Sequence, residues 1–195
     1  MTALKRFWLV CLLVTMVIMP DGLMGFEPRQ NPTEKLKALS SRVYSLLNSS
    51  LTDSLRIYSQ MGVKEAKRVG NLGQASYFYY TLGLSYRNRN FESTRLFFDS
   101  ALYLSEESDY VISAMLVYNA YSSEFRRRGY LDSALFYITQ SNNILEGLPD
   151  SDNKFSTQAS NFGKVGLIYL KKGDYSRALE NLNEVVDIST YVNLE

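Results

Sequence analysis

The chain has 195 residues, of which 21 are Lys or Arg and 20 are Asp or Glu, and it contains no histidine and one cysteine, Cys11. The lack of histidine excludes Ser-His-Asp and Cys-His catalytic sites and histidine-ligated zinc, and one cysteine cannot form an intramolecular disulfide. A net charge of +1 provides no electrostatic basis for binding nucleic acid, which needs many contacts between basic side chains and phosphate.

Residues 1–25 have the order of a secretory signal peptide. Lys5 and Arg6 precede a largely apolar run, 7–19, and Pro20 and Gly25 follow it. The run is too short to cross about 30 Å of hydrocarbon as a helix. We therefore expect a bacterial protein that is exported across the inner membrane to the periplasm, with cleavage near Gly25. An uncleaved anchor in the inner membrane is the alternative.

After a short linker, 26–32, residues 33–190 show helical periodicity. A helix start is indicated by Asn31 as a cap, Pro32 at the first helical position and Glu34 at the third. Apolar residues then recur at steps of three and four, beginning with Leu36, Leu39, Val43 and Leu46. Alternation of the strand type is missing over any useful length. The sequence therefore predicts an all-α chain that ends in a short tail, 191–195.

The helical region contains an internal repeat. Three segments, 73–106, 112–146 and 155–190, align with one another, and 33–70 is a degenerate first copy. The repeated positions are Tyr79, Leu82, Gly83, Tyr86, Ala101, Tyr118, Gly129, Ala134, Phe162, Gly166, Tyr169, Gly173, Tyr175 and Ala178. This pattern resembles the tetratricopeptide repeat (TPR) family. The resemblance implies a right-handed α-solenoid of about four antiparallel helix pairs.

Each repeated position has a physical role. Gly83 and Gly166 allow the two helices of a repeat to approach closely, and Ala134 and Ala178 do the same from the second helix. Gly129 is expected to end its helix in a left-handed conformation, as is Gly173. The aromatic residues are expected to fill the space between successive hairpins.

The repeat is longer than usual. The equivalent residues Ser54, Thr94, Ala134 and Ala178 recur at intervals of 40, 40 and 44 residues, whereas TPR units have 34. Such arrays are similar to the TPR regions of kinesin light chains and of bacterial sensor and regulator proteins. The latter often carry a histidine kinase or helix-turn-helix output domain. One hypothesis is therefore the sensory, ligand-binding N-terminal part of a truncated regulator. The last repeat is not followed by a polar capping helix. We therefore expect either that the chain is a fragment or that a partner covers the apolar face at the end of the solenoid.

The resemblance also implies a ligand on the concave face formed by the first helices of the repeats. The expected binding residues are Tyr77, Tyr80, Arg87, Asn88, Asn119, Arg126, Arg127 and Lys171. Arg and Asn donate several hydrogen bonds to carboxylates, which favours a protein or peptide partner that is acidic or has a free carboxylate. The two tyrosines could stack on such a peptide.

A structural interpretation of the same charges stays open. Arg126, Arg127 and Arg128 directly precede Gly129, and a Lys-Lys pair directly precedes Gly173. Cations in the last turn of a helix interact favourably with its negative end. The leading functional prediction is nevertheless a non-catalytic, protein-binding scaffold, with no metal site and no cofactor.

Overall fold

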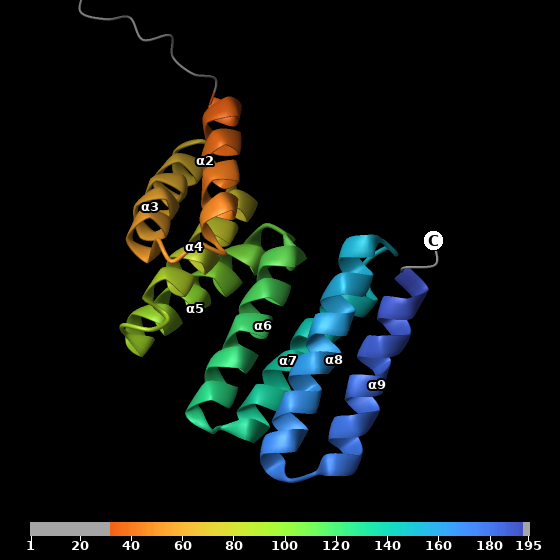
Figure 1. The fold of residues 1–195 in the computed structure, drawn as a ribbon. Coiled ribbons are helices and arrows are strands. Elements are labelled where there is room, and N and C mark those ends of the chain that lie inside the picture. The colour runs from red at the N-terminus through yellow and green to blue at the C-terminus, as the bar shows by residue number, and fades with distance from the viewer. Residues whose placement is uncertain (1–31, 193–195) are drawn as a thin grey trace, which may run out of the picture. The chain divides into compact units, whose positions relative to one another are not determined.

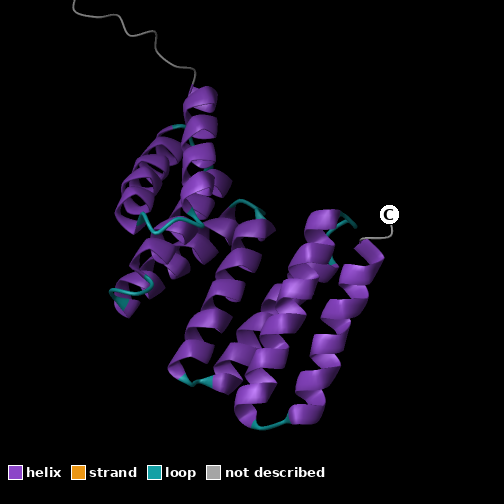
Figure 2. Cartoon of the chain, viewed as in Figure 1, coloured by secondary structure: helices purple, strands orange, loops and turns teal. Residues whose placement is uncertain are grey.

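The computed structural model describes residues 32–192, which form eight helices and no strand (Figures 1 and 2). The helices are α2 (Pro32–Leu46), α3 (Thr52–Arg68), α4 (Leu72–Tyr86), α5 (Phe91–Glu107), α6 (Val111–Arg128), α7 (Leu131–Glu146), α8 (Asp152–Lys172) and α9 (Tyr175–Val192). The all-α prediction is confirmed for these residues. None of the helices in this range is long and apolar enough to cross a membrane.

Some of the predicted segments lie outside the described residues. The signal peptide, 1–25, is one of them, and so is the linker 26–32 except for Pro32, which is the first residue of α2. Helix α9 continues through Val192, into the predicted tail. The chain divides into two compact units, and the second, Leu36–Glu195, contains all the contacts described below.

The helices pack in the order in which they follow one another along the chain. The closest packing joins α4 with α5, α6 with α7, and α8 with α9. These pairs correspond to the predicted repeats 73–106, 112–146 and 155–190, beyond which the helices extend by up to three residues. Helix α3 packs against α4 as extensively as these pairs do. The first helices of neighbouring repeats also touch, α4 with α6 and α6 with α8. This arrangement is compatible with an all-α helical solenoid.

Glycines allow the closest approaches between helices. A Cβ atom at Gly83 would lie 2.5 Å from Cδ1 of Phe98, and one at Gly166 would lie 2.9 Å from Cγ of Leu182. The same holds for Gly62 of α3, where a Cβ would lie 2.3 Å from the ring of Phe78. Because Gly62 has no side chain, α3 and α4 can approach each other as closely as the two helices of one repeat do.

Helices α6 and α8 end at glycines in the left-handed conformation. Gly129 has a φ of 87° and Gly173 a φ of 79°, and each donates its N–H to carbonyls of the preceding turn. An L side chain rarely adopts such a φ, so glycine sets these helix ends. Both basic runs of the sequence therefore lie in the last turn of a helix.

The buried core is concentrated in the first three hairpins. One cluster joins α2, α3 and α4 around Phe78, and a second joins α5 and α6 around Phe98 and Tyr121. In α9, among the residues whose side chains are described, only Ala178 is buried. The α8–α9 hairpin thus contributes the least to the interior.

Candidate binding face on the first helices

Three cationic residues come together from three successive first helices. Arg87 follows the last residue of α4, Arg126 lies in the last turn of α6, and Lys164 lies in the middle of α8. Burial lowers the pKa of Lys164, and the charges of Arg87 and Arg126 lower it further, to about 8. The effect of both arginines on one lysine indicates a region of positive potential that spans α4, α6 and α8.

A chain of amide side chains holds Lys164 in place. Its ammonium donates a hydrogen bond to Oδ1 of Asn119, and Nδ2 of Asn119 donates to Oδ1 of Asn161. Nδ2 of Asn161 then donates to Oδ1 of Asn142, at 2.7 Å. Because Asn161 is only 1% exposed, its amide cannot reorient freely in water. The chain therefore orients Asn119 and Lys164 together.

Arg126 has an unused donor. Its Nε is buried and has no hydrogen-bond partner among the described residues. A buried donor without a partner costs about 1–3 kcal/mol, so an acceptor at this point would be stabilising. Lys171 lies close by, since its ammonium is 3.4 Å from the carbonyl oxygen of Arg126.

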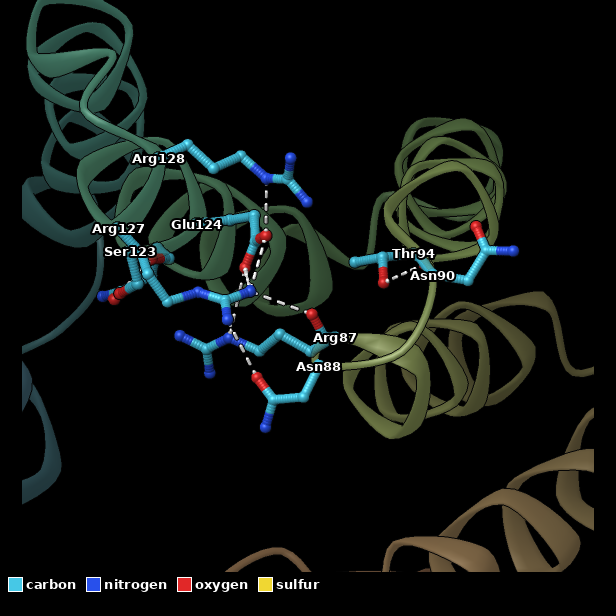
Figure 3. A network of polar contacts seen from close by, with 9 residues as sticks. Arg87, Asn88, Asn90, Thr94, Ser123, Glu124, Arg127 and Arg128 are labelled. Atoms are coloured by element: carbon cyan, nitrogen blue, oxygen red, sulfur yellow. Dashed lines mark hydrogen bonds and ion pairs between the residues drawn. The ribbon is translucent and has the colours of Figure 1, made fainter.

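Glu124 neutralises part of the basic run that was predicted to bind ligand (Figure 3). Its carboxylate is fully buried and accepts hydrogen bonds from Nη2 of Arg127 at 2.7 Å and from Nε of Arg128 at 2.9 Å. Nε of Arg87 lies 3.7 Å away. Burial alone would raise the pKa of Glu124, but these hydrogen bonds outweigh it and hold the pKa below its ordinary value.

Arg127 also joins the ends of two helices. It donates to Oδ1 of Asn88 at 3.1 Å and to the carbonyl of Arg87 at 2.9 Å, as Figure 3 shows. Both partners follow the end of α4, whereas Arg127 lies at the end of α6. Two of the predicted binding residues, Arg127 and Asn88, are thus occupied with each other within the chain.

The two predicted tyrosines pack mostly against their own surroundings. The ring of Tyr80 stacks on Phe98 with 6.1 Å between the centroids, and burial raises the pKa of Tyr80 to about 12. Tyr77 lies 6.2 Å from Tyr80 and meets Phe78 edge-on at 5.9 Å. These neighbours take up much of the ring surface that stacking on a peptide would need.

Sequence reasoning missed Lys164, Asn161 and Glu124. A signal for Lys164 was present, because it stands two residues before Gly166, at the position that Thr81 and Ala120 occupy in the preceding repeats. Thr81 and Ala120 are small and buried, so a lysine in this register was unusual. Glu124 stands three and four residues before two arginines, a spacing that pairs side chains on a helix.

The face thus offers positive charge and hydrogen-bond donors. Arg87, Arg126 and Lys164 supply charge, and Asn119 lies beside the lysine. No group of three or more Cys, Asp or Glu residues that could hold a metal ion occurs within residues 32–192. Arg126 and Lys164 form no salt bridge within this range, so their charge is available to an anion, whereas Arg87 also lies 3.7 Å from the carboxylate of Glu124.

Comparison with known proteins supports the fold. No protein-family model matches the chain, and no curated protein matches it in sequence. Among solved structures, the chain is similar to the crystal structure of BtubC (BKLC) from P. vanneervenii, with a TM-score of 0.69 and 16% sequence identity. The match covers 85% of this chain and 67% of that chain. At this identity the likeness shows the fold alone.

Proposed function

We propose that the chain is a non-catalytic TPR-type scaffold that is exported across the inner membrane and binds a protein or peptide on the face formed by α4, α6 and α8. Two observations support the TPR assignment. The repeated glycines stand where helices approach most closely, and the whole arrangement is similar to another helical protein. We infer a scaffold function because stacked helical repeats form extended concave surfaces that bind partners.

The cationic cluster carries the proposal. Arg126 has a buried donor without an acceptor, and Lys164 is held at a lowered pKa by burial and by two neighbouring cations. An anionic group placed here would accept from both and would relieve their mutual repulsion. An acidic side chain or a free carboxyl terminus of a peptide has this chemistry.

Binding of short peptides tests this function. Fluorescence anisotropy of the full chain is measured with labelled acidic peptides that have a free carboxyl terminus and with the same peptides in amidated form. Lys164→Met removes the central charge at similar length, and Lys172→Met is the matched control, because Lys172 pairs with exposed Asp132. We expect Lys164→Met to weaken binding about tenfold, which corresponds to about 1.4 kcal/mol, and Lys172→Met to leave it nearly unchanged.

Two results would contradict the proposal. If no peptide binds more tightly to the unmodified chain than to Lys164→Met, the cluster is not the binding site. If both lysine variants weaken binding equally, only overall charge matters. Export is tested separately, by determining the N-terminal residue of the protein recovered from the periplasm, where a new terminus near residue 26 is expected.

A further inference from the structure

The α8–α9 hairpin lacks an aromatic side chain that the two preceding hairpins have. In the α6–α7 hairpin, Tyr137 packs on Tyr118 and Phe125, with centroid distances of 6.1 and 5.2 Å. In the α4–α5 hairpin, Phe97 packs in the same way on two tyrosines, at 6.3 and 5.3 Å from Tyr79 and Tyr86. In both hairpins, one ring from the second helix thus fills a space beside two rings of the first.

In α9 the equivalent residue is Asn181. It stands three residues after Ala178, as Tyr137 stands after Ala134 and Phe97 after Thr94. A hollow of about 350 Å³ is open beside it, lined by Phe162, Tyr169, Arg177, Glu180, Asn181 and Glu184. Phe162 and Tyr169 are the equivalents of the two rings on which Tyr137 packs. The hollow therefore has two aromatic side chains and no ring between them.

The rim of this hollow is acidic. Glu180 and Glu184 form no salt bridge within residues 32–192, whereas Arg177 lies 3.5 Å from the carboxylate of Asp174. Two carboxylates thus remain without a cationic partner in this part of the chain. A positively charged group would complement them.

Guanidinium groups already lie over equivalent rings of the repeat. Arg177 is placed over Tyr169, with 5.4 Å from its Cζ to the ring centroid. Arg56 of α3 is placed over Tyr86 at the same distance, and Tyr86 is the equivalent of Tyr169. The chain's own arginines thus place a planar cation over a ring at this register, and in the hollow this cation is Arg177 itself.

We propose that the hollow between α8 and α9 binds an arginine side chain of a partner protein. A guanidinium is flat, stacks on aromatic rings and pairs with carboxylates, so it matches both the aromatic walls and the acidic rim. A lysine would satisfy only the charge, and a phenylalanine only the shape. This inference does not depend on the anion-binding face, which other residues form.

Titration with small arginine derivatives tests the inference. The isotopically labelled full chain is titrated with N-acetyl-arginine amide and followed by NMR, with the amides of N-acetyl-citrulline, N-acetyl-lysine and N-acetyl-phenylalanine as comparisons. We expect arginine amide to shift the side-chain amide signal of Asn181 saturably. The citrulline, lysine and phenylalanine amides should bind at least about fivefold more weakly, because each lacks either the charge or the plane.

Matched variants locate the site. Asn181→Phe restores the ring found in α5 and should abolish the saturable shift of the Phe162 and Tyr169 signals while it preserves or raises thermal stability. Asn183→Phe places the same ring on α9 outside the hollow and should leave arginine binding unchanged. The double variant Glu180→Gln/Glu184→Gln should keep the fold and weaken binding at least about fivefold, which corresponds to about 1 kcal/mol.

Four results would overturn the inference. The first three are the absence of a saturable shift with arginine amide, equal binding of citrulline, lysine or phenylalanine amide, and unchanged arginine binding in Asn181→Phe. A loss of binding in Asn183→Phe would also contradict it, because that residue does not line the hollow.

Discussion

The same motif position is buried in the middle of the array and exposed in its last hairpin. Phe98, Ile138 and Leu182 each stand four residues after the small residue at the fourth position of the second helix, and they are 0%, 1% and 39% exposed. Phe98 is covered by Tyr121 of the next repeat, with 5.0 Å between ring centroids. The comparison shows that this position of the second helix is buried when the next hairpin packs over it.

The two regions also fill the groove within a hairpin differently. The middle hairpins close it with Phe97 and Tyr137, whereas the last hairpin has Asn181 and an open hollow. Helix α9 therefore differs from α5 and α7 on two faces. One face lacks a covering helix among the described residues, and the other lacks an aromatic side chain.

The largest expected effect comes from truncating the buried position in the middle of the array. Phe98→Ala should lower the free energy of unfolding by about 3–5 kcal/mol, because it leaves a cavity against Gly83, Tyr80 and Tyr121. Leu182→Ala should lower it by only about 1–2 kcal/mol, because solvent already reaches that side chain. Urea denaturation followed by circular dichroism measures both. Equal losses of stability in the two variants would show that the last hairpin buries this position as completely as the middle hairpin does.

The next effect concerns a position that is charged in α6 and apolar in α8. Glu124 stands two residues after Ser122, and Ile168 stands two residues after Gly166. Glu124→Gln should lower stability by about 2–3 kcal/mol, because the variant loses the charge that binds Arg127 and Arg128. Ile168→Val should lower it by about 1 kcal/mol.

The response to acid distinguishes the two variants. The pKa of Glu124 is lower in the folded than in the unfolded chain, so its contribution is present above the ordinary carboxyl pKa and is lost as pH falls through the folded pKa. Glu124→Gln should therefore lose less stability than the unmodified chain on acidification, whereas Ile168→Val should follow the unmodified chain. Denaturation series at several acidic pH values check this, and parallel curves for Glu124→Gln would contradict it.

Much of the fold could be predicted from the sequence because its signals are local. Helical periodicity, the glycines that end α6 and α8, and the small residues at close contacts are each visible within one repeat. The close approach at Gly62 was not predicted. That contact is with Phe78, in the hairpin that the alignment treats as the next repeat.

The candidate site was predicted only in part because its contacts cross between repeats. Lys164 meets Asn119 across 45 residues and Asn161 meets Asn119 across 42, and neither pairing follows from the spacing within one helix. The basic run at Arg126–Arg128 was recognised, but the buried carboxylate that takes up two of its charges was not. The directions of the side chains at the end of α6 determine that Arg127 and Arg128 pair with Glu124, whereas Arg126 is left for a ligand.

Two glycines on first helices should respond in opposite directions to substitution by alanine. Gly83→Ala should lower stability by about 1–3 kcal/mol, because its Cβ would lie 2.5 Å from Phe98. Gly163 of α8 has no neighbour closer than 3.9 Å to such an atom, so Gly163→Ala should raise stability by about 0.5–1 kcal/mol through helix propensity. Thermal denaturation would show shifts of opposite sign. A stabilised Gly83→Ala would mean that α4 and α5 can separate without loss.

The smallest expected effect is the pH dependence due to Lys164. Its pKa is about 8 in the folded chain and 10.5 as the ordinary value, so the unfolded chain holds this proton more firmly. Stability should therefore rise as pH increases from about 8 towards 10.5. The gain should be about 1 kcal/mol, because solvent screening reduces the effect for a side chain that is only partly buried.

The tyrosines act in the opposite direction at higher pH. Tyr80 has a pKa raised to about 12, so the unfolded chain loses this proton first and stability falls above about pH 10. The Lys164→Met variant keeps all the tyrosines. Their contribution therefore cancels when the unfolding free energy of the variant is subtracted from that of the unmodified chain. That difference should change in favour of the unmodified chain between about pH 7 and 9.5. A difference that stays constant would show that Lys164 titrates as an ordinary lysine, which would remove the positive potential on which the proposed anion site depends.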